Sequence, residues 1–318
     1  MRVLRYIIVL LVLLLVCNEI KAQQAPMFTN YSNSYAVINP GYAGLSEGVN
    51  ILGIYRDQWS GFKDMDGNRV SPRTLLFSGD IPVRFLRGGL ALGIMKDEIG
   101  FENNVSVNLG YSYHFDLGAG TLGLGAAFNL VNRSMDFSKL NPLVSSDPFL
   151  PTGEETSMLF DANLGLFWMV PETYYIGFSV TNLFESKGKE LVGSAESSAS
   201  FVGDRTFYLV AGFEYQFTNS LFAILPSLCI MSDVASTQYN IGSKVMYNDR
   251  FWVGLNYRFQ ESVDIMAGIK IKDLQISYAY DINTLGLAVP GSHEVSISYC
   301  FKLDLDKHPR IYRSIRYL

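Results

Sequence analysis

The chain has 318 residues, of which 48% are hydrophobic and only 17% are charged, and its formal net charge is -5. This length forms one large domain or two small ones. An acidic chain is not attracted to phosphate backbones, so nucleic acid is excluded as the expected partner. The 21 Phe, 19 Tyr and 28 Gly residues favour strands and tight turns, because these residue types lower helix propensity.

Residues 1–22 have the pattern of a cleaved secretory signal peptide. Basic residues precede an apolar run over residues 6–16, and Ala22 is the expected cleavage point. The run is too short for a transmembrane helix, which needs about 20 residues. A lipoprotein signal at Cys17 is the alternative, but the residue before it is not small. Cleavage removes three basic residues and one acidic residue, so the net charge becomes -5 - 3 + 1 = -7.

Residues 23–48 are polar and aromatic, and Asn39-Pro40-Gly41 marks a turn. They precede the first expected strand. We therefore predict a periplasmic or plug segment here, separate from the barrel wall.

Apolar and polar residues alternate with a period of two in the segments that follow. In residues 251–259, the apolar side chains lie at odd positions and alternate with Trp252, Gly254, Asn256 and Arg258. Such segments are roughly 9–14 residues long, as in tilted membrane-crossing strands, whereas soluble strands average about 5–6. A soluble sandwich would also alternate, but the small residues on the polar face and the aromatic residues near the segment ends favour a membrane barrel.

The alternation predicts an all-β fold, a transmembrane outer-membrane antiparallel β-barrel of about 14 strands, over residues 49–304. The expected strands are 49–59, 73–81, 88–96, 103–116, 120–133, 157–170, 173–183, 204–217, 220–232, 236–247, 250–259, 262–271, 273–283 and 292–304. Short connections alternate with longer ones such as 134–156 and 184–203. Because bacterial barrels have short periplasmic turns and longer outer loops, both termini are expected in the periplasm.

Five charged or titratable residues are expected near the outer ends of the first, eleventh, thirteenth and last strands. We predict that they form a polar network in the lumen, because buried charges must pair or contact water. The alternative is a set of separate, hydrated lumen residues. The five residues are Arg56, Arg258, Asp281, His293 and Glu294.

The outer loop 134–156 carries apolar residues between prolines. Exposed apolar residues often form contact surfaces, so we expect this loop to contact an outer partner; folding back over the lumen is the alternative. The residues concerned are Leu140, Leu143, Phe149 and Leu150.

Residues 305–318 form a basic tail beyond the last strand. The tail is not needed to close a barrel, so it is a candidate periplasmic docking peptide; the alternative is a solvated chain end. Its arginines are Arg310, Arg313 and Arg316.

No pattern in the sequence indicates an enzyme or a cofactor. No Ser or Asp recurs with a histidine at a spacing that indicates a catalytic triad, and no Cys/His cluster has zinc spacing. Residues 64–68 resemble a calcium loop but lack its downstream bidentate Glu. A buried or lipid-facing thiol is favoured over a disulfide for Cys229 and Cys300. The histidines considered are His114, His293 and His308.

Several short phrases occur in order from about residue 24 to the end of the chain. They are Asn39-Pro40-Gly41-Tyr42-Ala43-Gly44, Tyr55-Arg56-Asp57-Gln58-Trp59, Ser71-Pro72-Arg73-Thr74, Tyr278-Ala279-Tyr280-Asp281, Gly291-Ser292-His293-Glu294 and the ending Arg313-Ser314-Ile315-Arg316-Tyr317-Leu318. Each phrase is weak alone, but together they specifically resemble the PorP/SprF family of Bacteroidetes outer-membrane proteins. Gly41 stands where that family usually has Ala.

The resemblance implies a role in the type IX secretion system and, in some members, in gliding motility. It implies a barrel that docks or anchors a large secreted surface protein, an adhesin, through the C-terminal signal domain of that protein. Periplasmic secretion-ring components are further implied partners, and outer-membrane lipid and lipopolysaccharide would surround the barrel. A passive porin or hydrophobic-substrate channel is the alternative, because about fourteen strands can enclose an aqueous pore; a barrel enzyme is the third class.

Overall fold

The computed structural model describes residues 25–46, 48–139, 153–194, 197–284 and 289–302. The expected signal peptide, the apolar positions of the outer loop and the basic tail lie outside these residues. In the part of the chain that the structure describes, no helix is long and apolar enough to cross a membrane.

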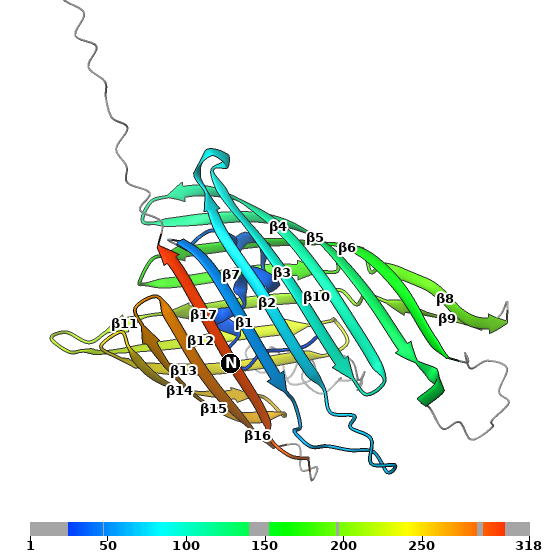
Figure 1. Ribbon diagram of the computed structural model, residues 1–318. Helices are drawn as coiled ribbons and strands as arrows, with labels where there is room; N and C mark the ends of the chain where they lie inside the picture. The colour runs from blue at the N-terminus through cyan, green and yellow to red at the C-terminus, as the bar shows by residue number, and fades with distance from the viewer. Residues whose placement is uncertain (1–24, 47, 140–152, 195–196, 285–288, 303–318) are drawn as a thin grey trace, which may run out of the picture.

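One antiparallel sheet forms almost the whole molecule and closes on itself (Figure 1). Each strand pairs with its neighbour in sequence, β17 pairs with β1, and β10 pairs with both β7 and β12. The strands are β1 (Gly48–Asp57), β2 (Arg73–Val83), β3 (Gly88–Ile99), β4 (Glu102–Leu117), β5 (Gly120–Asp136), β6 (Glu154–Val170), β7 (Tyr174–Thr181), β10 (Thr206–Phe213), β11 (Tyr215–Gln216), β12 (Phe222–Ser232), β13 (Thr237–Tyr247), β14 (Phe251–Arg258), β15 (Ser262–Ile271), β16 (Leu274–Asn283) and β17 (Ser292–Lys302).

The sheet has 15 labelled strands, but β10 and β11 are one strand interrupted at Glu214. The structure is therefore a closed 14-strand barrel, which confirms the predicted fold class. Closure leaves no open sheet edge, so the backbone N–H and C=O groups of neighbouring strands can bond each other. A sheet must meet this condition to cross a bilayer.

The side chains of the barrel alternate between two environments, as β14 illustrates. Phe251, Val253, Leu255 and Tyr257 are exposed on the outer face, while Trp252, Gly254, Asn256 and Arg258 are buried inside. Successive side chains of a strand point to opposite faces, so the period of two in the sequence becomes an apolar outside and a mixed inside. The outer face is the surface that suits lipid.

The two ends of the barrel differ. The connections between β1 and β2, between β5 and β6, and between β7 and β10 are long and leave from one end, here called the long-loop end. The other, short-turn end has tight turns such as 118–119 and 272–273, and it includes the 3-10 turn η3 (Arg84–Leu86).

One long connection contains structure that the sequence did not predict. We expected residues 184–203 to be a plain loop, but β8 (Lys187–Ser194) and β9 (Ser197–Val202) pair as a separate two-stranded sheet. This hairpin extends beyond the barrel wall in Figure 1. A further 3-10 turn, η4 (Phe137–Lys139), follows β5.

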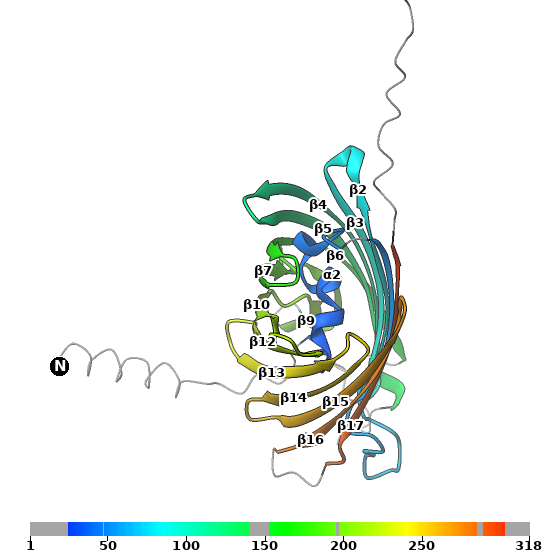
Figure 2. The ribbon, with the colours of Figure 1, turned by 90° about the vertical axis from the view of Figure 1, so that its left-hand side faces the viewer.

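Residues 25–46 lie inside the barrel, as the blue segment of Figure 2 shows. They form η1 (Tyr31–Asn33), the one-turn helix α2 (Tyr35–Ile38) and η2 (Pro40–Tyr42). Thr29 contacts Asp281 near the long-loop end, whereas Gly44 contacts Asp80 on the other side of the lumen, nearer the short-turn end. Of the two positions considered for this segment, the periplasm and the lumen, residues 25–46 occupy the lumen. We call them the lumen segment.

Candidate functional site

The lumen segment is held at the long-loop end by a buried ionic network centred on Thr29. Arg56 donates to the Asp281 carboxylate at 2.6 Å and to Glu294 at 3.2 Å, and all three side chains are 2–3% exposed. The Thr29 hydroxyl donates to Asp281 at 2.8 Å and accepts from Arg56 at 2.7 Å. The backbone N–H groups of Thr29 and Asn30 donate to the two oxygens of Glu294 at 2.7 and 2.9 Å. Every charge in the network thus has a partner, as burial requires.

A second arginine extends this network along the wall. Arg258, 1% exposed, lies 3.4 Å from the Thr29 hydroxyl and 2.7 Å from Glu261, and its guanidinium is 3.7 Å from Asp264. Asn256 donates to the Thr29 carbonyl at 2.9 Å. One threonine of the lumen segment therefore contacts side chains from four strands.

Four of the five residues expected in a lumen network lie together: Arg56, Arg258, Asp281 and Glu294. The expectation for His293 is wrong. Its ring is exposed on the outer face, where Nδ1 lies 2.7 Å from the Tyr278 hydroxyl. Adjacent residues of a strand point to opposite faces, so Glu294 and His293 cannot both face the lumen.

Asn39 fixes the turn in the middle of the lumen segment. Its side-chain oxygen accepts from Gly41 N at 2.9 Å, and its amide nitrogen donates to the carbonyls of Leu166 and Phe178 at 3.0 and 3.3 Å. Hydrogen bonds within the turn, and from Asn39 to the carbonyls of two wall strands, β6 and β7, therefore hold the turn in place.

Glycines on the wall let this turn approach the strands closely. A Cβ added to Gly125 would lie 2.2 Å from the Pro40 carbonyl carbon, and one added to Gly165 would lie 2.1 Å from Asn39 Oδ1. A Cβ on Gly41 itself would lie 2.8 Å from the Gly123 carbonyl oxygen. These distances are shorter than real Cβ contacts, so the fit depends on the absence of side chains at these positions.

Wall side chains also bond the backbone carbonyls of the lumen segment. Ser112 donates to Gly41 O at 2.9 Å and Ser179 donates to Ile38 O at 2.6 Å. His114 Nε2 lies 2.9 Å from Ala43 O. These bonds satisfy backbone groups that a short, irregular segment cannot pair within itself.

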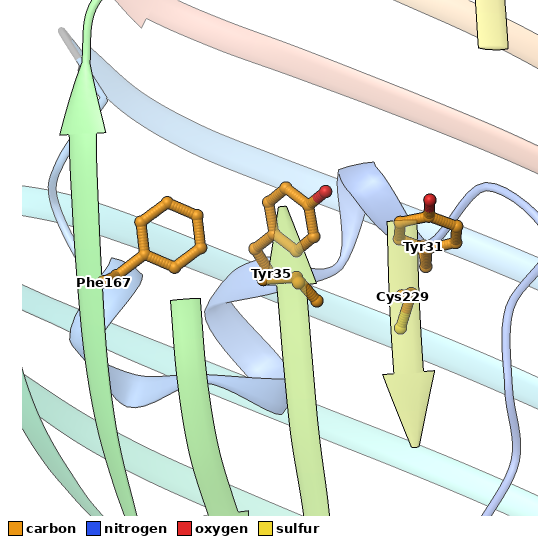
Figure 3. Packing of buried hydrophobic residues seen from close by; sticks show 5 residues of the cluster. Tyr31, Tyr35, Phe167 and Cys229 are labelled. Carbon is orange, nitrogen blue, oxygen red and sulfur yellow. The ribbon is translucent and has the colours of Figure 1, made fainter. Parts of the chain in front are cut away.

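Aromatic packing adds an apolar contact between the lumen segment and the wall (Figure 3). Tyr35 lies 5.5 Å from Phe167 and 5.3 Å from Tyr175, measured between ring centroids. Figure 3 also shows Tyr31 beside Cys229. Burial raises the pKa of Tyr31 and Tyr35, which stay neutral, and their hydroxyls bond Ser227 and Tyr175.

The candidate metal-ligating residues are not gathered into a cluster in the described part of the chain. No group of three His, Cys, Asp or Glu side chains that could hold a metal ion occurs there. Asp64 instead accepts from the backbone N–H groups of Asp66 and Asn68, at 3.0 and 2.7 Å, within its own loop. Cys229 and Cys300 are both free thiols.

Other expected site residues lie outside the described residues: Leu140, Leu143, Phe149, Leu150, His308, Arg310, Arg313 and Arg316. Sequence reasoning missed Thr29 and the wall residues around Asn39. The signal for Asn39 was present, because the Asn-Pro-Gly turn is part of a phrase that resembles a family motif. Nothing local distinguishes Thr29, whose contacts with Asp281 and Arg258 are more than 200 residues away in sequence.

The phrases that carry the family resemblance meet in the lumen. Asn39 and Gly41, Arg56, Asp281 and Glu294 come from four of them, and all contact the lumen segment or belong to it. A model of the PorP/SprF family, type IX secretion system membrane protein, matches residues 20–299. The chain belongs to the PorP/SprF family. This PorP/SprF chain is therefore an outer-membrane β-barrel of the type IX secretion system, with secretion-system partners, and neither its family nor its fold is that of an enzyme class.

Solved structures agree on the fold alone. The toluene transporter TbuX of Ralstonia pickettii is 15% identical, with a TM-score of 0.50, over 84% of this chain and 93% of that one. The toluene transporter TodX of Pseudomonas putida is 12% identical, with a TM-score of 0.47, over 88% and 95%. The outer membrane protein Omp33 of Acinetobacter baumannii is 8% identical, with a TM-score of 0.47, over 81% and 100%. No curated protein matches the sequence of this PorP/SprF chain.

Proposed function

We propose that this PorP/SprF barrel is a closed docking platform, which holds a large secreted surface protein at the cell surface through the C-terminal signal domain of that protein. The observation that carries this proposal is the occupied lumen. A buried network anchors the lumen segment, and wall glycines fit closely around it. A barrel whose interior is fixed in this way is better suited to binding at its rim than to conducting solutes.

The long-loop end is the proposed docking face. In barrels of this kind the longer loops face outward, and here that end carries the β8–β9 hairpin and loop 134–156 with Leu140, Leu143, Phe149 and Leu150. Apolar positions in such a loop suit a protein contact. If the held protein is an adhesin, we expect the barrel to take part in gliding motility. In the basic tail, Arg310, Arg313 and Arg316 suit contact with periplasmic ring components.

Capture of the partner tests the proposal. The tagged barrel, purified from native outer membranes in mild detergent after crosslinking, is expected to carry along a secreted protein that ends in a type IX signal domain. Deletion of residues 140–151 is expected to lose that protein while the barrel stays at its normal level in the membrane. A barrel that still retains the protein after this deletion contradicts the loop assignment, and a barrel without companions contradicts the docking role.

Planar-bilayer conductance separates the docking platform from a porin. The native barrel is expected to show no steady conductance, because residues 25–46 fill the lumen. Deletion of residues 25–44, with the signal peptide retained, is expected to give a stable open pore, since barrels of about this strand number can enclose an aqueous channel. Equal conductance of the native and shortened barrels would support the porin instead.

A further inference from the structure

A cavity of about 240 Å³ opens at the short-turn end of the lumen, away from the Thr29 network. Pockets for small ligands measure about 300–1,000 Å³, so this cavity suits one or two residues of a peptide rather than a folded domain. Aromatic rings of the lumen segment, β6 and β7 form much of its inner wall: Tyr35, Tyr42, Phe167 and Tyr175.

The inner end of the cavity carries a cation, Lys244, which the buried Glu294 carboxylate attracts only from beyond ion-pair distance. Lys244 Nζ donates to Asn30 Oδ1 at 2.6 Å and to Ser32 Oγ at 2.7 Å, and it lies 4.6 Å from the centre of the Trp252 ring. Among the described residues, no carboxylate oxygen forms an ion pair with it within 4.0 Å. An ammonium group has three N–H donors, so Lys244 has one more donor than these two bonds use.

The mouth of the cavity carries the opposite charge. Glu172 lies in the exposed turn between β6 and β7, and Glu214 lies where β10 and β11 are interrupted; both line the cavity. Asp249, in the turn between β13 and β14, is close enough to act electrostatically on Glu214. The cavity is therefore cationic at depth, aromatic along its walls and acidic at its opening.

We propose that this cavity binds the carboxyl terminus of a protein chain that ends in an apolar residue preceded by a basic one. The terminal carboxylate would accept from Lys244, as a charge-assisted hydrogen bond. The last side chain would pack on the aromatic walls, and the basic side chain would lie between Glu172 and Glu214. A ligand with a single charge would leave either Lys244 or the two glutamates without an opposite charge. A carboxylate, an apolar side chain and a basic side chain, in this order, match the cavity from its inner end to its mouth.

The short-turn end faces the periplasm in barrels of this kind, so the ligand belongs to a periplasmic protein. The proposal thus goes beyond the surface docking described above and adds a second contact on the opposite face. Neither contact depends on the other.

A labelled pentapeptide, Gly-Ser-Ala-Arg-Phe with fluorescein at its amino end, is the probe. Its binding to the full barrel in lipid nanodiscs is measured by fluorescence anisotropy, with the free acid compared with the C-terminal amide. The native barrel is expected to bind the acid about tenfold more tightly than the amide, since a charge-assisted bond to a partly buried lysine contributes on the order of one decade in Kd.

Matched variants assign the effect to Lys244. Lys244→Gln is expected to reduce the acid-to-amide ratio to about one, and Lys244→Arg, which keeps the charge, to retain most of it. Lys272→Gln, an exposed lysine at the same end but outside the cavity lining, is expected to change nothing. Glu214→Gln is expected to weaken the preference for Arg over Gln in the peptide about threefold.

Three results overturn the proposal. The first is an absence of saturable acid binding to the native barrel up to about 1 mM, which is the weakest affinity of interest. The second is an equal affinity for acid and amide. The third is an equal loss of the acid-to-amide ratio in Lys272→Gln and Lys244→Gln. Far-UV circular dichroism verifies that each variant keeps its sheet.

Discussion

Arg56→Met is expected to lower the free energy of unfolding by about 3–5 kcal/mol, the range for a buried ion pair that loses one member. The substitution leaves Asp281 and Glu294 as buried carboxylates without their cation, both 2–3% exposed. Both also bond Thr29, so the lumen segment is expected to loosen with them. The free energy of unfolding is measured by equilibrium unfolding in guanidinium chloride. In a planar bilayer, the variant is expected to show intermittent channel openings that the native barrel lacks.

Arg73→Met is the matched control. Arg73 pairs with Glu98 at 3.0 Å, but the two side chains are 41% and 32% exposed, and the pair lies away from the lumen segment. Exposed pairs contribute about 0–1 kcal/mol, because water screens them. Similar losses in the two variants would mean that the Arg56 network does not hold the lumen segment.

Gly125→Ala is expected to displace the lumen segment and to destabilise the barrel by about 1–3 kcal/mol, the usual range for overpacking. The new methyl group would lie 2.2 Å from the Pro40 carbonyl carbon and 2.3 Å from Gly41 N. Both atoms are backbone, so the turn at Asn39 must move as a unit. Faster proteolysis of the lumen segment and a lower unfolding midpoint in guanidinium chloride are the two measurements.

Gly53→Ala makes the same change where there is room. A Cβ at Gly53 meets no atom within 4 Å. Alanine costs less backbone entropy than glycine in a strand, so this variant is expected to be neutral or stabilising by up to about 1 kcal/mol. If Gly125→Ala and Gly53→Ala destabilised the barrel equally, close contact with the wall would not be what holds the lumen segment in place.

The two pairs of variants act at different places on the same element. Arg56 acts near the long-loop end of the lumen segment, and Gly125 acts at its middle turn. If both open the pore while the surface partner is retained, then closure of the lumen and docking are separate properties of the barrel. If both also release the partner, the seated segment is needed for the docking face.

The residue pattern alone was sufficient to predict the wall of this barrel. The period of two predicted the strands and their outer faces, because the side-chain repeat of a strand is a local property. The position of Glu294 on the inner face follows in the same way from Val295, which is exposed on the outer face. The same rule, applied to His293, would have placed that ring outside.

The segment that occupies the lumen could be identified only from the folded structure. Residues 25–46 have no strand or helix period and form only single turns, so nothing local predicts their place. Their position depends on contacts such as Thr29 with Glu294, which are 265 residues apart, and on wall glycines that matter only once Asn39 and Pro40 lie against them. Closure of the barrel brings these distant residues together, and close packing and paired buried charges then fix the segment in one position.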